Sequence, residues 1–273
     1  MKVHHLSCAS LCPVGGRLVT GRKGPAEMTC HCLLIESDAG LVLVDTGIGS
    51  AAAADPVGQL SGLFVKVVRP RLEPAETAVA QLAALGFSAR EVRHVIPTHL
   101  DLDHAGGLPD FPGATVHVFE PEYQAAMARD TTTRKRRYQP AQWAHEPRWV
   151  RYEPRGEPWF GFETVRALEG LPPEILLVPL PGHSTGLCGV AVQAPDGWLL
   201  HAGDAYFHHA ELEPEGKCPV ALRLFQRLTA EDNRARVHNQ TRLRALAAEQ
   251  GAAVRIFSAH DPVELSRLRA QTR

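Results

Sequence analysis

The stretch THLDLDHAGG, residues 98–107, places two histidines and two aspartates within six consecutive positions. They are His99, Asp101, Asp103 and His104, and they directly follow VRHVIP (92–97), which has the apolar pattern of a buried strand. Histidine and aspartate are ligands that suit zinc and other first-row divalent metals. Four such groups in one loop are more than a polar turn needs, so the stretch predicts a metal site.

Polar residues also follow the ends of other predicted strands along the chain. Asp45 follows LVLV (41–44), His183 follows ILLVPL (175–180), Asp204 ends WLLHAGD (198–204), and His260 lies in AVRIFSAHD (253–261). Loops at strand ends, held by a rigid sheet, are where catalytic groups concentrate. These residues are therefore candidates for the same site.

Short β-rich runs alternate with helical stretches, which predicts a mixed α/β fold. Further strands are expected at 29–37, 114–119 and 189–194, and helices at 75–86, at 230–250 and after the last strand. The 44% hydrophobic content and the formal net charge of −1 are those of an ordinary globular protein. The charge gives no reason to expect nucleic acid or membrane binding, so we expect a small-molecule substrate as the partner.

No apolar run approaches the roughly 20 residues of a membrane helix, and MKVHHLSCAS (1–10) lacks the apolar core of a signal peptide. We therefore expect a cytoplasmic protein. Six cysteines in 273 residues do not make a disulfide scaffold. Cys30 and Cys32 could form a metal clip with His31, but their alternation along a predicted strand favours buried thiols.

Five motifs together resemble the metallo-β-lactamase superfamily, in that family's order. They are LVDTG (43–47), THLDLDHAGG (98–107), PGHSTG (181–186), HAGDA (201–205) and SAHD (258–261). The resemblance implies a four-layer αβ/βα sandwich, here a single domain over residues 1–273, with a metal site at one edge of two sheets.

The resemblance also implies the ligands of one or two divalent metal ions per chain. His99, Asp101 and His183 would hold one ion, Asp103, His104 and His260 would hold the second, and Asp204 would bridge them. Asp45 would brace the metal loop from behind. Zinc is the expected metal, with manganese and iron as alternatives.

Asp101 departs from the family pattern, which has a histidine at this position. A third carboxylate lowers the net positive charge of the two-metal site and makes the first ligand set richer in oxygen, which favours manganese or iron relative to zinc. Three interpretations remain open. Asp101 is a ligand, or its carboxylate does not reach the metal and the site is mononuclear, or the chain is a binding protein without catalysis.

The expected reaction is attack of metal-bound hydroxide on a carboxylic ester or lactone. Asp103 would help deliver a proton to the leaving group, and Tyr206 would donate to the oxyanion or simply pack beneath the loop. Lactonases of the family carry a tyrosine three residues after the bridging aspartate, where this chain has Phe207. The alternatives are a mononuclear iron sulfur dioxygenase, a thioester hydrolase and a non-catalytic binding protein.

The segment from about 121 to 170 is expected to be an insertion beside the site. Its part from 129 to 160 is rich in arginine and aromatic residues, among them Arg134, Arg137, Tyr138 and Trp159. Such a segment could be a specificity lid for an apolar or anionic substrate. It could equally be a cap packed on its own aromatics or the surface of a homodimer. Nucleic-acid processing is not expected, because such members of the family carry large extra domains.

Overall fold

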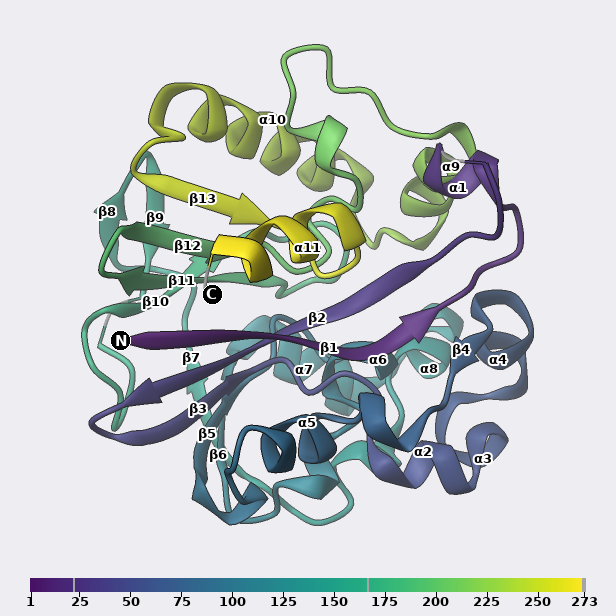
Figure 1. Cartoon of the computed structure of the whole chain (residues 1–273), viewed down its shortest axis with the longest axis vertical. Helices are drawn as coiled ribbons and strands as arrows, with labels where there is room; N and C mark the ends of the chain where they lie inside the picture. Colours follow the sequence, from purple (N-terminus) through teal and green to yellow (C-terminus); the bar gives the residue numbers. More distant parts are fainter. Residues whose placement is uncertain (22, 166, 272–273) are drawn as a thin grey trace.

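Two β-sheets form the centre of the molecule in the computed structural model, which describes residues 1–21, 23–165 and 167–271 (Figure 1). The larger sheet has the strand order β4-β1-β2-β3-β5-β6-β7. Its strands are β1 (Lys2–Leu11), β2 (Met28–Ser37), β3 (Gly40–Val44), β4 (Pro70–Arg71), β5 (Val92–Ile96), β6 (Thr115–Phe119) and β7 (Arg148–Tyr152). The smaller sheet contains β10 (Ile175–Pro179), β11 (Cys188–Ala194), β12 (Gly197–His201) and β13 (Val254–Phe257), in that order. A separate hairpin joins β8 (Glu157–Trp159) to β9 (Phe162–Thr164).

Most helices lie on the outer faces of the sheets and around one end of them, whereas the C-terminal helix lies between the smaller sheet and the strands β1 and β2 (Figure 1). The helices are α1 (Arg17–Thr20), α2 (Ser50–Ala54), α3 (Pro56–Leu60), α4 (Gly62–Val68), α5 (Ala78–Ala84), α6 (Leu102–Ala105), α7 (Glu120–Ala128), α8 (Thr132–Arg137), α9 (Val220–Thr229), α10 (Asn233–Gln250) and α11 (Pro262–Gln271). Within the described part of the chain, none of these helices has both the length and the apolar character needed to cross a membrane.

Side chains alternate in direction along each strand, and this alternation produces the layers of the fold. On β2, Leu33 and Ile35 face the smaller sheet, where they pack in one cluster with Leu177 and Val190. Leu34, pointing the other way, packs in a second cluster with helical residues such as Leu82 of α5. Side chains on opposite faces of a strand alternate because the strand is pleated. On the far side, Leu243 and Leu246 of α10 cover the smaller sheet. This helix–sheet–sheet–helix order confirms the predicted four-layer sandwich.

Strand direction explains why the polar residues gather at one edge. β3 runs parallel to β5, and β12 runs parallel to β13. β10 points the same way as β12, since both are antiparallel to β11. Asp45, the loop 98–104, His183, Asp204 and His260 all follow the carboxyl ends of these strands. The fold therefore brings five separate segments to one edge of the paired sheets.

Two helix boundaries differ from the expected ones because a capping side chain sets them. The helix expected at 75–86 begins at Ala78, where the Thr77 hydroxyl accepts the Ala80 N–H. The helix expected at 230–250 begins at Asn233, capped by Asp232. Pattern reasoning did not anticipate β1, which pairs with β2 along nearly its whole length.

Only part of the segment 121–170 lies outside the sandwich. Its residue 166 is not among the described residues. Within it, β7 pairs in parallel with β6 and so completes the larger sheet. The helix α8 before it carries the consecutive basic residues 134–137. That helix and α7, which also lies in the segment, carry the residues that bear on the site.

Candidate metal centre

Asp45 supports the loop 98–104 from behind. It has a positive φ of 56°, an uncommon backbone conformation that aspartate tolerates better than most residues. Its Oδ1 accepts the Thr98 N–H at 2.6 Å, and its Oδ2 accepts the Thr98 hydroxyl at 3.0 Å. His104 Nδ1 lies 2.8 Å from the same Oδ2. The carboxylate therefore fixes both ends of the loop and the orientation of the His104 ring.

His99, Asp101 and His183 form a first cluster of donor atoms. Asp101 Oδ2 lies 3.1 Å from His183 Nε2 and 3.4 Å from His99 Nε2. Both imidazoles are buried, whereas the Asp101 side chain is 17% exposed. Two loops from different sheets thus contribute to one group of three ligand atoms.

Asp103, His104 and His260 form a second cluster. The Nε2 atoms of His104 and His260 lie 3.3 Å apart. Asp103 Oδ2 lies 3.6 Å from His260 Nε2, and Asp103 Oδ1 lies 4.0 Å from His104 Nε2. This carboxylate is the looser member of the group.

Asp204 lies between the two clusters and presents one oxygen to each. Its Oδ2 is 3.4 Å from His183 Nε2 and 3.8 Å from His99 Nε2. Its Oδ1 is 3.1 Å from His260 Nε2 and 3.2 Å from His104 Nε2. The arrangement is that of a bridging carboxylate.

Hydrogen bonds on the far side of the rings direct three Nε2 atoms into the clusters. His104 Nδ1 donates to Asp45, His260 Nδ1 donates to the Thr29 carbonyl at 2.7 Å, and His99 Nδ1 lies 3.1 Å from the Thr98 hydroxyl. Such outer contacts fix the tautomer that a metal needs. His99 Nε2 is buried and has no hydrogen-bond partner among the described residues.

These separations suit metal ions. Ligand atoms at about 2.1 Å from a tetrahedral metal lie roughly 3.4 Å apart. Burial would raise the pKa of the Asp204 carboxyl, but His260, His104 and His183 outweigh it and hold that pKa well below its usual range. Although burial opposes it, Asp204 and neighbouring carboxylates raise the pKa of His104 and of His260. The carboxylates therefore create a field that favours positive charge at this position.

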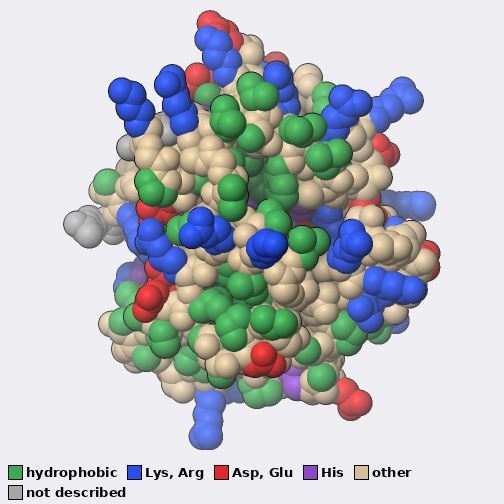
Figure 2. All heavy atoms as spheres, turned by 90° about the vertical axis from the view of Figure 1, so that its right-hand side faces the viewer, with side chains coloured by type: hydrophobic (Ala, Val, Ile, Leu, Met, Phe, Trp, Pro, Cys, Tyr) green, Lys and Arg blue, Asp and Glu red, His purple; other side chains and the backbone are tan. Residues whose placement is uncertain are grey.

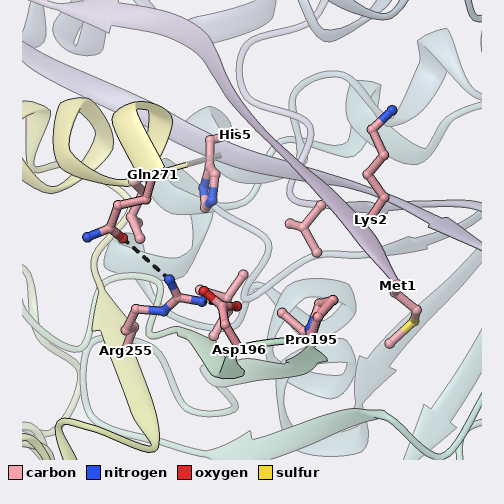
Figure 3. Close-up of a pocket in the computed structure, with 11 residues that line it drawn as sticks. Met1, Lys2, His5, Pro195, Asp196, Arg255 and Gln271 are labelled. Atoms are coloured by element: carbon pink, nitrogen blue, oxygen red, sulfur yellow. Dashed lines mark hydrogen bonds and ion pairs between the residues drawn. The ribbon is translucent and has the colours of Figure 1, made fainter. Parts of the chain in front are cut away.

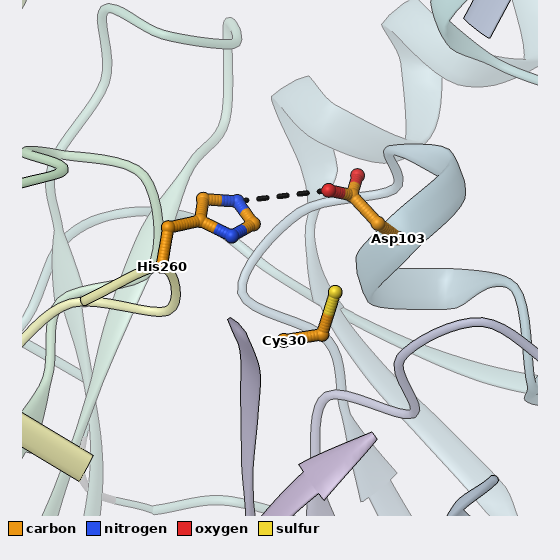
Figure 4. A group of neighbouring side chains, drawn as sticks. All are labelled: Cys30, Asp103 and His260. Carbon is orange, nitrogen blue, oxygen red and sulfur yellow. Dashed lines mark ion pairs between the residues drawn. The ribbon is translucent and has the colours of Figure 1, made fainter. Parts of the chain in front are cut away.

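Cys30 lies at the edge of the second cluster, with its Sγ directed toward Asp103 and His260 (Figure 4). Its ligand atom and theirs all lie within 4.8 Å of one another. Burial, followed by the charge of Asp103, raises the pKa of this thiol well above its usual range. Both Cys30 and Cys32 are buried, as free thiols expected on a strand.

Tyr206 and Phe207, in the loop after Asp204, have different surroundings, and those of Tyr206 match the packing alternative rather than the oxyanion role. Tyr206 is fully buried and its hydroxyl donates to Glu264 at 2.8 Å, so it packs beneath the loop and is not available to an oxyanion. Phe207 instead contacts the clusters: its ring centroid lies 5.0 Å from that of His260 and 5.8 Å from that of His183. His209 is held by Asp261 at 2.7 Å, and His208 is partly buried beside it.

Two charged residues were not assigned to the metal centre from the sequence. Glu122 of α7 is fully buried and connects the loop 98–104 to the loop 181–186. Arg137 of α8 reaches Asp101, with Nη1 at 2.9 Å from Oδ2 and 3.1 Å from Oδ1. An aspartate where the family has histidine was the one signal that could have prompted a search for a cation.

The face that carries α1, α4, α8 and α9 covers this edge of the sheets. Figure 2 shows hydrophobic side chains around a hollow near the middle of that face, with Lys and Arg side chains on either side. Exposed apolar residues on these helices include Leu18, Leu63, Leu224, Phe225 and Leu228. Phe225 contacts Phe207, with centroids 5.9 Å apart, and so links α9 to the ligand clusters.

A separate cavity of about 410 Å³ lies away from the ligand clusters (Figure 3). It opens beside the turn that precedes β12 and the start of β13, at the amino ends of these strands. His5, Asp196, Arg255 and Gln271 are among its lining residues, and Arg255 pairs with Asp196 at 2.6 Å. This cavity is not part of the candidate metal centre.

Comparison with known proteins identifies the family of this chain. A model described as the metallo-beta-lactamase superfamily matches residues 26–260. The probable metallo-hydrolase Rv2300c of Mycobacterium tuberculosis is 40% identical over 262 residues, which cover 96% of this chain and 81% of that protein. The N-acyl homoserine lactonase AttM of Agrobacterium fabrum is 36% identical over 110 residues, 40% of this chain and 41% of that protein.

A solved N-acyl homoserine lactone hydrolase, with the product N-hexanoyl-L-homoserine at its catalytic metal centre, has the same fold. It superposes with a TM-score of 0.72 at 21% identity, covering 97% of this chain and 95% of that one. The family model spans both halves of the sandwich and the loops that carry the His and Asp clusters. The chain therefore belongs to the metallo-beta-lactamase superfamily and is a metallo-hydrolase of that fold.

Proposed function

We propose that the chain hydrolyses a carboxylic ester or a lactone at a two-metal centre. The observation that carries the proposal is the position of Asp204, which presents one carboxylate oxygen to each donor cluster. When bound, divalent ions at such a centre polarise a carbonyl oxygen and lower the pKa of water. One ion would be held by His99, Asp101 and His183, the other by Asp103, His104 and His260, with Asp204 shared.

The remaining chemistry falls to the protein's own groups. Ester cleavage leaves an alkoxide that needs a proton. The attacking water loses a proton, and Asp103 is placed to take it up and pass it to this alkoxide, since its side chain is 12% exposed and adjoins the second cluster. Asp45 holds the His104 ring so that Nε2 stays a ligand atom. Phe207 covers one side of His183 and His260 and limits the access of water there.

The surroundings favour a substrate with an apolar portion. Phe207 and Phe225 lead from the clusters to the exposed apolar residues Leu224 and Leu228 of α9. An acyl chain could lie along this surface while its carbonyl reaches the metal centre. The likeness to lactonases that act on N-acyl homoserine lactones supports the same class of substrate.

Zinc is the ion we propose, because histidine and carboxylate ligands of this number suit it. Manganese or iron remain the alternatives that the carboxylate of Asp101 would favour. Elemental analysis of protein purified without chelators and without an affinity metal column identifies the ion. We expect two zinc ions per chain, one for each of the two clusters that Asp204 faces.

Turnover tests the reaction. N-hexanoyl homoserine lactone and aryl esters of short acids are suitable substrates, with acid release followed by titration. Asp204→Ala should reduce the rate at least roughly a hundredfold, since even outer-sphere losses at metal sites cost 10–100-fold. Asp196→Ala, in the exposed turn before β12, is the matched control and should retain the rate.

Two results would contradict the proposal. One is an Asp204→Ala variant that keeps most of its turnover. The other is a single iron per chain with oxygen uptake on thiol or persulfide substrates, which would indicate a sulfur dioxygenase.

A further inference from the structure

Arg137 is the buried cation of the candidate metal centre. It ends α8, is 9% exposed, and its Nη1 contacts both carboxylate oxygens of Asp101. Its Nη2 donates to the Thr229 carbonyl, at the end of α9, at 2.6 Å. A guanidinium stays charged at any ordinary pH, and burying it is costly unless an anion accompanies it. Asp101 is the anion that accompanies this guanidinium.

The two oxygens of Asp101 have different surroundings. Oδ2 faces His99 Nε2 and His183 Nε2 at 3.4 and 3.1 Å, as a ligand atom would. Arg137 Nη1 lies 2.9 Å from this same Oδ2 and 3.1 Å from Oδ1, so the guanidinium contacts the carboxylate through both oxygens. An aspartate side chain carries no ring that packing could orient, so a second contact is needed to aim one oxygen into the cluster.

Charge gives a second reason for the pair. With Asp101, the donor set contains three carboxylates, Asp101, Asp103 and Asp204, instead of the two that a histidine at 101 would leave. The guanidinium contributes one positive charge in direct contact with the added carboxylate. The aspartate and arginine together are therefore neutral, like the imidazole that they replace.

We propose that Arg137 is a positioning residue that aims Asp101 into the first cluster and offsets its charge, so that the two act as one metal-binding unit. This inference rests on the proposed metal centre, but it concerns only how that centre is built. Removing the arginine alone leaves an extra uncompensated carboxylate in the centre. Removing the aspartate alone leaves a buried guanidinium next to cations.

The competing explanation is that Arg137 merely ties α8 to α9 through Thr229. The two explanations differ in what restores metal binding. If Arg137 orients Asp101 and offsets its charge, then a neutral histidine at 101 makes the arginine unnecessary for metal binding. If Arg137 serves the α8–α9 contact, a histidine at 101 restores nothing.

The experiment compares four proteins: wild type, Arg137→Gln, Asp101→His, and the double variant Asp101→His/Arg137→Gln. Zinc affinity and stoichiometry are measured by competition with a chromophoric chelator, and the melting of each metal-free protein is recorded alongside. Arg137→Gln should weaken one of the two zinc ions by roughly 10–100-fold, the range for outer-sphere residues. Asp101→His should also be impaired, and the double variant should bind zinc more tightly than either single variant.

Arg136→Gln is the matched control, because Arg136 lies on the same helix with its side chain in solvent. It should bind zinc as the wild type does. Unchanged zinc affinity in Arg137→Gln would overturn the inference. So would a loss that Asp101→His fails to restore in the double variant. Wild-type protein that binds no zinc would instead overturn the proposed metal centre, so the two failures are distinguishable.

Discussion

Glu264 is a buried carboxyl group close to a second acidic residue, Asp261. It is buried beneath the loop that carries Asp204, accepts the Tyr206 hydroxyl at 2.8 Å on Oε1 and accepts the Ser258 N–H at 2.8 Å on Oε2. Burial, followed by the charge of Asp261, raises the pKa of Glu264 to about 8 from an ordinary value of 4.5. Near neutral pH the folded protein therefore keeps a proton that the unfolded chain releases.

This residue should make the folded protein less stable as the pH rises. Between pH values of about 5 and 8 only the folded state holds the proton, so the contribution of Glu264 to the free energy of unfolding falls by up to about 1.4 kcal/mol per pH unit. Glu264→Gln imitates the protonated acid, with its oxygen toward Ser258 and its amide toward Tyr206. We expect the stability of the variant relative to wild type to increase across this range, measured by urea denaturation at several pH values.

The comparison isolates Glu264, because other titrating groups are shared by the two proteins. Glu249→Gln, at an exposed position on α10, is the control and should follow the wild-type curve. A stability difference between Glu264→Gln and wild type that does not vary with pH would show that this carboxyl is ionised in the folded protein.

At the scale of elements, Glu122 joins three segments that lie around the first cluster. Its Oε1 accepts the Leu100 N–H at 3.0 Å and the Tyr138 hydroxyl at 3.1 Å. Its Oε2 accepts the Ser184 hydroxyl at 2.7 Å and the Gly186 N–H at 3.0 Å. One carboxylate on α7 therefore connects the loop of His99, the loop of His183 and the residue after α8.

Replacing Glu122 should damage both stability and metal binding. Glu122→Ala leaves four buried donors without their acceptor, at about 1–3 kcal/mol for each group that stays unsatisfied. We expect the free energy of unfolding to fall by at least about 3 kcal/mol and zinc affinity to fall with it, measured by denaturation and chelator competition. Glu120→Ala, two positions earlier on α7, is the control. A Glu122→Ala protein with wild-type zinc affinity would mean that the two loops hold their positions without this carboxylate.

The sequence predicted the elements better than their contacts. Strand patterns such as VRHVIP and the polar residues after them follow from local alternation and from chain direction, so the fold and the gathering of His and Asp residues could be anticipated. The contact between Arg137 and Asp101 spans 36 positions, and that between Glu122 and Leu100 spans 22. Which basic or acidic residue turns inward depends on how α7 and α8 pack over the loops, and no local pattern encodes that packing.

The same reasoning explains Tyr206 and Phe207. Adjacent residues in a loop point in different directions, and only the tertiary fold determines which of them contacts the ligands. Here the phenylalanine contacts His183 and His260, while the tyrosine is held by Glu264 on α11.

At the scale of the whole molecule, the candidate metal centre joins the two sheets. His99, Asp101, Asp103 and His104 follow β5 of the larger sheet, whereas His183, Asp204 and His260 follow strands of the smaller one. Each cluster takes donors from both sides. Ions bound there would hold the halves of the sandwich together at this edge. Without them, Asp204 and the buried imidazoles of both sheets would face one another with no shared cation.

Metal removal should therefore lower the stability of the entire fold rather than of one loop. A ligand that binds only the folded state stabilises it by about 2.7 kcal/mol when its free concentration is a hundred times Kd. We expect the melting temperature to fall after treatment with a chelator, and to rise with added zinc in proportion to the logarithm of its concentration. Asp204→Ala should show little of this response, because its substitution removes the donor common to both clusters. If neither chelator nor zinc changes the melting temperature of the wild type, the two sheets hold together without bound metal. The His and Asp clusters would then contribute nothing to the stability of the sandwich.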